Sequence, residues 1–211
     1  MNSECILCQL NSIKRHLKTV DVDESTRLNI IRDFLDFLSK ADKKSTNPEL
    51  AAQLNRLISV YHPDKEIYKK EKKEFNELMI ELFDKYMEIA KSSGNPVKTA
   101  MKLAIAGNII DFGPDHSFDA EETINSVLQA NLKIDDSDEL FKNTGQSKNV
   151  LYLADNAGEI VMDNLFIKIL NHSGLKVAVR GKPVLNAVVL EDAKYIGLDK
   201  IAPIIENGSD I

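Results

Sequence analysis

One short segment of the chain combines residue types that bind cations and activate water. It covers residues 155–159 and follows a short apolar run that is typical of a buried strand. In an open parallel sheet, ligands bind beyond the carboxyl ends of the strands, where this segment would lie. Asp155 offers a carboxylate and Asn156 an amide oxygen, both suited to divalent ions such as Mg²⁺ or Mn²⁺. The segment therefore predicts a metal site, although Asp155 or Asn156 could instead cap the next helix, with Glu159 completing a capping box.

The same edge of the predicted sheet could also hold an anion. A helix is expected to begin near Gly158, and free N–H groups at a helix N-terminus attract phosphate. Arg180 and Lys182 follow the next predicted strand, so they would stand at the same edge and could contact phosphate oxygens. The alternative for these two residues is an exposed basic turn. Metal, helix terminus and cations together favour a phosphorylated ligand.

A second segment places two polar residues in an apolar run. Asn108 and Asp111 are three residues apart within 104–113, so they share one face of a helical turn. Polar groups that are buried in such a run need partners. They are therefore candidate site residues, although local capping hydrogen bonds would also explain them.

The remaining elements must position these segments. Apolar spacings of three and four predict helices over 26–40 and 75–90, and shorter helices are expected over 4–19, 48–60 and 97–107. The apolar face over 26–40 is expected to hold Leu28, Ile31, Phe34, Leu35 and Leu38. The acidic stretch 115–139 is interpreted as a solvated helical face or an acidic loop.

The second half alternates between strand and helix patterns. Strands are predicted over 149–154, 176–179 and 200–205, with helices over 158–171 and 188–196 between them. Such alternation implies parallel strands with right-handed crossovers. We therefore expect an α+β or α/β fold, in which a mainly helical part, 1–147, packs on a Rossmann-like α/β part, 148–211. Three strands are fewer than a doubly wound sheet normally has, so the sheet is expected to be incomplete.

Composition excludes several classes of function. There are 27 Lys and Arg against 33 Asp and Glu, which gives a net charge of −6. This balance argues against nucleic-acid binding and against a basic membrane-surface role. No apolar run is long enough to span a bilayer, and the N-terminus lacks a signal-peptide pattern. We expect a soluble, cytoplasmic protein.

Two short motifs have several interpretations. Cys5 and Cys8 form a C-x-x-C pair near the N-terminus, which could be two small helix residues, half of a metal site or a redox pair. Residues 61–65 read Tyr-His-Pro-Asp-Lys and are similar to the His-Pro-Asp loop of J-domain co-chaperones. The alternative there is a tight turn in which Pro63 starts the next helix.

Longer motifs resemble one family over nearly the whole chain. Residues 104–113 and 155–163 together are similar to the DUF89 family, the damage-control phosphatases with an ARMT1-like metal-binding domain. The C-x-x-C pair resembles the archaeal-type subfamily. Further similar blocks are Asn95-Pro96, 181–183, 190–193 and 207–210.

This resemblance implies an enzyme that hydrolyses small phosphomonoesters, such as sugar phosphates or damaged phosphometabolites, with a divalent metal ion (Mg, Mn, Co or Ni). It implies that Asp155 and Asn156 bind the metal and that Asp155 and Glu159 act in catalysis. The residues expected to bind the substrate are Asn108, Asp111, Arg180, Lys182, Ser209 and Asp210.

The chain departs from the family pattern in two places. An Asn-Asp pair, whose Asp supplies a third metal ligand, reads Asn186-Ala187 here. Family members also continue beyond the position of Asp210 into a Lys-Gly-containing motif. We therefore expect weakened phosphatase activity. The alternative is a protein that binds metal or phosphometabolites without catalysis.

Overall fold

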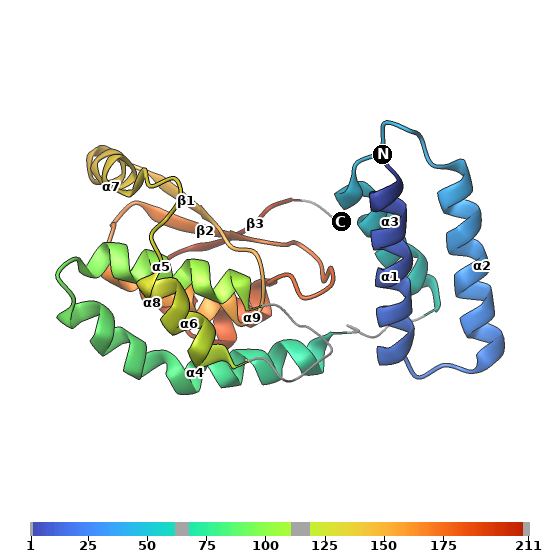
Figure 1. Cartoon of the computed structure of the whole chain (residues 1–211), viewed down its shortest axis with the longest axis horizontal. Coiled ribbons are helices and arrows are strands. Elements are labelled where there is room, and N and C mark those ends of the chain that lie inside the picture. Colours follow the sequence, from blue (N-terminus) through green and yellow to red (C-terminus); the bar gives the residue numbers. More distant parts are fainter. Residues whose placement is uncertain (1, 62–67, 111–118, 209–211) are drawn as a thin grey trace. The chain divides into compact units, whose positions relative to one another are not determined.

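The computed structural model of the chain describes residues 2–61, 68–110 and 119–208 and divides into two compact units. The first unit spans Met1–Lys69 and the second spans Lys70–Asp210. The predicted division at residue 147 falls within the second unit, just before its first strand. Figure 1 shows the helices and strands of both units. Each unit has its own apolar core.

Residues 2–61 of the first unit form three helices, α1 (Ser3–Thr19), α2 (Glu24–Lys40) and α3 (Asn47–Tyr61). Asn2 and Asp23 cap α1 and α2, because their side-chain oxygens accept backbone N–H groups of the first turn. Apolar side chains from all three helices form one core. The prediction of helices in this region is confirmed, with boundaries shifted by one or two residues at most positions.

The apolar face of α2 differs from the prediction. Ile30, Phe34 and Leu38 are buried, whereas Leu28 and Leu35 are 43% and 47% exposed. The buried residues follow one row at a spacing of four, and the two exposed leucines lie at the margin of that row. Apolar spacing located the helix correctly but placed two leucines wrongly on its buried face.

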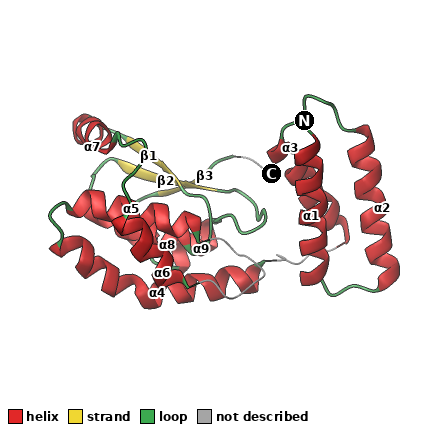
Figure 2. Ribbon diagram, viewed as in Figure 1, coloured by secondary structure: helices red, strands yellow, loops and turns green. Residues whose placement is uncertain are grey.

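The second unit contains a small parallel sheet, shown in yellow in Figure 2. Its strands are β1 (Val150–Leu153), β2 (Leu175–Val179) and β3 (Ile204–Glu206), in the order β1-β2-β3. Val150 pairs with Leu175, and Val177 pairs with Ile204. Helix α8 (Glu159–Leu170) connects β1 to β2, and α9 (Leu190–Tyr195) with the 3-10 helix η1 (Leu198–Lys200) connects β2 to β3. The predicted helical protein with a small parallel sheet is confirmed.

The third strand begins later than predicted. Residues 198–200 form a 3-10 turn, and the strand starts at Ile204, after Pro203. Proline has no backbone N–H, so it commonly stands where pairing begins. Ala202 is buried and its N–H donates to Leu198 O, whereas Ile201 is 38% exposed, so the apolar residues before Pro203 belong to the end of this turn.

Helices cover one side of this sheet. The unit also contains α4 (Lys69–Ser92), α5 (Pro96–Ile109), α6 (Ala120–Gln129) and α7 (Ser137–Gln146). Figure 1 shows α4, α5 and α8 on the same side of the strands, and α5 packs along α8. On β1, Leu151 and Leu153 are 57% and 72% exposed, so the described residues of the second unit do not cover these two side chains.

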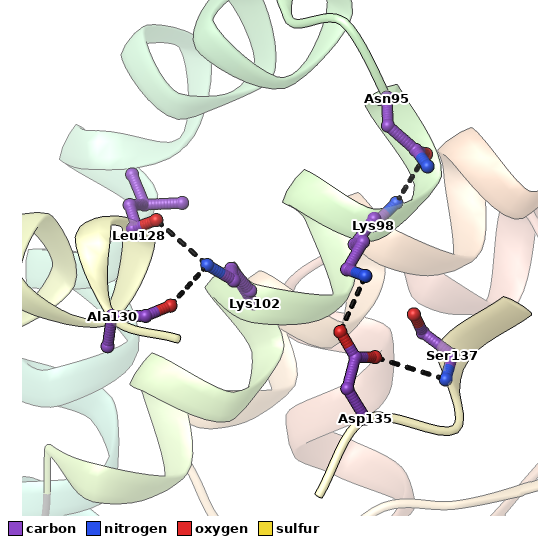
Figure 3. Close-up of polar contacts among 7 residues, drawn as sticks. All are labelled: Asn95, Lys98, Lys102, Leu128, Ala130, Asp135 and Ser137. Atoms are coloured by element: carbon purple, nitrogen blue, oxygen red, sulfur yellow. Dashed lines mark hydrogen bonds and ion pairs between the residues drawn. The ribbon is translucent and has the colours of Figure 1, made fainter. Parts of the chain in front are cut away.

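Two lysines of helix α5 bind the end of α6 and the segment that joins α6 to α7 (Figure 3). The Lys98 ammonium lies 2.6 Å from Asp135 Oδ2 and lowers the pKa of that carboxyl to about 2, helped by hydrogen bonds from the next turn. Lys102 Nζ donates to the carbonyl oxygens of Leu128 and Ala130 at 3.0 and 2.6 Å. These contacts occupy last-turn carbonyls of α6, which have no partner within the helix. Among the described residues, no helix is both long and apolar enough to cross a membrane.

Candidate active site

Asn108, at the end of α5, contacts both acidic residues of the predicted site. Its Nδ2 donates to Glu159 Oε2 at 2.9 Å and lies 3.5 Å from Asp155 Oδ2. The approach depends on Gly107, because a Cβ there would lie only 3.1 Å from the Cα of Glu159. The fold therefore gathers one amide and two carboxyl groups from segments about fifty residues apart.

Backbone hydrogen bonds hold the loop after β1 against a second segment, residues 184–189. Val188 N–H donates to Asp155 O at 2.9 Å, and Ala157 N–H donates to Asn186 O at 2.9 Å. Between them, Asn156 and Ala187 form an isolated antiparallel bridge. The side chain of Ala187 is therefore a buried methyl group beside the predicted ligand Asn156.

Gly158 makes the turn into α8. Its φ is +79°, and a Cβ would lie 2.0 Å from the Phe75 ring, so only glycine fits. Its N–H donates to Asn76 Oδ1 at 2.6 Å. The N-cap of α8 is Gly158 itself, without a side-chain cap, so the alternative in which the side chain of Asp155 or Asn156 caps this helix is wrong, although Glu159 does accept the backbone N–H of Asn156.

The prediction that free N–H groups of α8 face a phosphate is also wrong for most of its first turn. Gly158 N–H is bound to Asn76, Ile160 N–H to Asn156 O and Val161 N–H to Gly158 O. The positive φ at Gly158 points its N–H toward Asn76. The N–H groups of Ile160 and Val161 are bonded to backbone carbonyl oxygens. If a phosphate binds at this edge, groups other than these three N–H donors would have to meet its charge.

Burial raises the pKa of two carboxyls on α8. The pKa of Glu159 is raised mainly by burial and also by the Asp155 charge, although hydrogen bonds from Asn108 and Asn156 oppose the shift. Asp163, one turn later, is fully buried, and its pKa is raised well above the usual range by burial and by Glu159. Tyr152 donates its hydroxyl to Asp163 Oδ1 at 2.6 Å. The hydrogen bonds to Glu159 and Asp163 thus offset only part of the cost of burying two neighbouring carboxyl groups.

The two predicted cations lie after β2. Arg180 and Lys182 are exposed, and neither forms an ion pair with another described residue. The turn is tied to the carboxyl end of β3, because Gly181 N–H donates to Asn207 Oδ1 at 3.2 Å and Asn207 N–H donates to Val179 O. Both cations therefore follow a strand at the sheet edge where Asp155 also lies.

Other predicted residues lie either outside the described part of the chain or in the first unit. Asp111, Ser209 and Asp210 lie outside the described residues, as do His62 to Asp64 of the J-domain-like motif. Cys5 and Cys8 lie on α1 of the first unit as free thiols, and Cys8 Sγ accepts a long contact from Asn47 Nδ2 at 3.9 Å. Their metal or redox role stays a prediction.

Sequence reasoning missed three buried polar residues around the loop, Lys72, Asn76 and Asp163, and the half-buried Tyr152. Lys72 and Asn76 stand in a strongly charged run, where a buried polar side chain has no distinctive pattern. Asp163 did carry a signal, because it is a lone acid in the apolar stretch 160–167. A charged residue in such a stretch is rarely buried without a partner.

The donor set fits a divalent cation that keeps much of its hydration shell. Asp155 is exposed and Asn156 is half-buried, and both supply the oxygen atoms that hard cations prefer. The amide of Asn108 bridges the acidic pair Asp155 and Glu159, and Asn156 adds hydrogen bonds to Glu159. In the residues that the structure describes, no group of three or more His, Cys, Asp or Glu side chains could hold a metal. Water would therefore complete the shell.

Comparisons with known proteins place this geometry in a family. The chain is 34% identical over 225 residues to a damage-control phosphatase of Pyrococcus horikoshii and 31% identical over 212 residues to one of Archaeoglobus fulgidus. These alignments cover 99% and 97% of this chain and 73% of each relative. A protein of Methanocaldococcus jannaschii is 29% identical, over 99% of this chain and 71% of its own.

The fold is also shared with a solved structure. The crystal structure of a DUF89 family protein from Pyrococcus horikoshii superposes with a TM-score of 0.83 at 26% identity, over 99% of this chain and 74% of that one. The family model of the damage-control phosphatase ARMT1-like domain matches residues 1–211. The chain therefore belongs to the damage-control phosphatase ARMT1-like family.

Proposed function

We propose that the chain is a metal-dependent phosphatase that acts on small phosphorylated metabolites. One observation carries the proposal: Asn108 holds the carboxyl groups of Asp155 and Glu159 together at the carboxyl edge of the sheet. Family membership supports it, because relatives in two archaea are named damage-control phosphatases. Sugar phosphates or damaged phosphometabolites are the proposed substrates.

In this proposal, Asp155 and Asn156 hold the divalent ion. When bound, such an ion polarises a phosphoryl oxygen and neutralises part of its charge. Arg180 or Lys182 stabilises the remaining negative charge of the phosphate, since both are exposed and unpaired with other described residues at the same edge. Asn108 orients both acids with the two N–H groups of its amide.

Glu159 is the proposed general base. Its carboxyl is half-buried, and Asn108 and Asn156 fix it by hydrogen bonds, so its free oxygen can orient an attacking water and accept a proton from it. The proton then passes to the leaving alkoxide or to solvent. Asp163 does not touch the solvent and takes no part in this step.

The second candidate is a protein that binds metal or phosphometabolites without turnover. The buried methyl group of Ala187 beside Asn156 favours it, because a carboxylate at that position would add a fixed negative charge to the metal shell. We therefore expect the rate of phosphate release to be low.

A phosphatase screen separates the two candidates. The purified chain is incubated with p-nitrophenyl phosphate and a panel of sugar phosphates, with Mg²⁺, Mn²⁺, Co²⁺, Ni²⁺ or chelator, beside Asp155→Ala. Metal-dependent phosphate release that Asp155→Ala lacks would support the enzyme. Binding of Mn²⁺ without any release would support the binding protein. Equal release by both variants would contradict a role of Asp155 in catalysis.

A further inference from the structure

One face of α4 places buried polar side chains against both segments of the candidate active site. Lys72 and Asn76 are one turn apart, and each is 1% exposed. A buried ammonium or amide is unfavourable unless its partners are well placed. The identity of those partners therefore indicates what the two residues do.

Asn76 binds the turn that leads into α8. Its Oδ1 accepts the N–H of Gly158 at 2.6 Å, in a buried hydrogen bond. The neighbouring Phe75 ring lies on the Cα side of the same glycine, where it leaves no room for a Cβ. Two consecutive residues of α4 thus fix Gly158 from two directions. The direction in which Asp155 and Glu159 leave this turn depends on that fixation.

Lys72 binds the second segment. Its Nζ lies 2.6 Å from Asp192 Oδ2, which also accepts the N–H of Val189 at 2.9 Å. This bond closes the first turn of α9 and ends the stretch 184–189 that runs beside the loop. The Lys72 ammonium thereby holds the backbone next to Ala187.

The two anchored segments are bonded to each other. Val188 N–H donates to Asp155 O, and Asn186 O accepts from Ala157 N–H, each at 2.9 Å. A shift of either segment would therefore move the backbone of the predicted ligands Asp155 and Asn156. The polar contacts of α4 both reach this pair of segments. Apolar side chains could fill the same space but could not make these hydrogen bonds.

We propose that Asn76 and Lys72 are positioning residues of the active site, which act through Gly158 and Asp192 on the metal-binding loop. The inference rests on the proposed function, because it assigns a role in that site. Loss of a group that orients metal ligands typically weakens metal binding by about 10- to 100-fold. The same loss should lower kcat more than it raises KM, because the substrate phosphate is held by other groups.

The test compares Mn²⁺ binding, by calorimetric titration, in the wild-type chain and in Asn76→Leu, which keeps the size of the side chain but removes the acceptor. We expect at least about tenfold weaker binding and a lower kcat with p-nitrophenyl phosphate. Asn76→Ala replaces it if Asn76→Leu does not fold. The matched control is Met87→Ala, a buried residue at the far end of the same helix, which should lose stability but keep Mn²⁺ affinity. Equal loss of affinity in the control and in the Asn76 variant would overturn the inference.

Lys72→Met supplies an independent measurement. It should weaken Mn²⁺ binding by a smaller factor, because Lys72 acts on the neighbouring segment. Because the two segments are bonded, the effects of the two substitutions should not add in the double variant. Strict additivity would contradict the shared pathway through the loop. If the wild-type chain binds no Mn²⁺, the proposed function itself fails, whereas wild-type affinity in Asn76→Leu overturns only the positioning role.

Discussion

The buried polar side chains of the two units differ in where their partners lie. In the first unit, Gln9 and His16 are buried and bind partners in the same helical unit, Asn47 and Tyr68. In the second unit, Lys72, Asn76 and Asp163 are buried, and their partners lie on or next to the Asp155 loop. The partners of a buried polar group thus distinguish a core whose polar contacts stay among its own helices from one whose polar contacts reach the candidate site.

The largest effect on stability is expected for a substitution at Gly158, which would test whether the two units respond separately. Gly158→Ala combines backbone strain at φ +79° with a clash against the Phe75 ring, so it should destabilise the second unit by about 4 kcal/mol. Hydrogen exchange read by mass spectrometry should then show faster exchange in peptides from 150–208 and no change in those from 2–61. Gly94→Ala is the control, because no atom lies within 4 Å of its Cβ position. Equal changes in both units would break the distinction.

The next effect concerns the first unit and is driven by pH. Burial, with a smaller contribution from Arg15, lowers the pKa of His16 to about 4. The unfolded chain then takes up a proton near pH 6.5 that the folded unit excludes. The stabilisation is complete above pH 6.5 and is lost as pH falls toward 4, by about 3 kcal/mol.

Denaturant titrations at pH 7 and pH 4.5 measure this loss. In His16→Gln the difference in the free energy of unfolding between the two pH values should shrink, because glutamine at position 16 does not titrate. Exchange in peptides from 2–61 assigns the change to the first unit. A wild-type pH dependence that survives in His16→Gln would show that other groups cause it.

The smallest effect is expected at Ala187. Ala187→Asp places a carboxylate beside Asn156, so it should tighten Mn²⁺ or Co²⁺ binding by roughly tenfold, within the range known for disturbed metal shells. Calorimetric titration measures it, with Asp155→Ala as the blank. If the variant binds no more tightly than the wild-type chain, position 187 does not face the metal, and its assignment as a vacant ligand position fails.

The sequence predicted the elements with strong periodicity. β1 and α8 were found because an apolar run ends abruptly in a polar loop, and that contrast also located Asp155 and Glu159. The contact between Asn108 and this loop could not be derived from spacing. It arises because Gly107 lets α5 approach α8, and such packing depends on residues far apart in sequence.

The supporting residues were the least predictable. Helix α4 begins at Lys69, whereas the apolar pattern predicted a start near Phe75, and the difference includes Lys72. Its first two turns are rich in lysine and glutamate, which normally indicates a solvated surface. The buried faces of Lys72 and Asn76 follow only from the tertiary contacts with Asp192 and Gly158.

The bond between Tyr152 and Asp163 also has a consequence on the scale of time. It joins β1 to α8, and its hydroxyl proton lies against a carboxyl group that has no contact with solvent. Opening of the contact between the strand and the helix would speed the exchange of that proton with water. Its exchange rate, read by NMR, would therefore report how often the contact between β1 and α8 opens beside the candidate site, without any ligand or label.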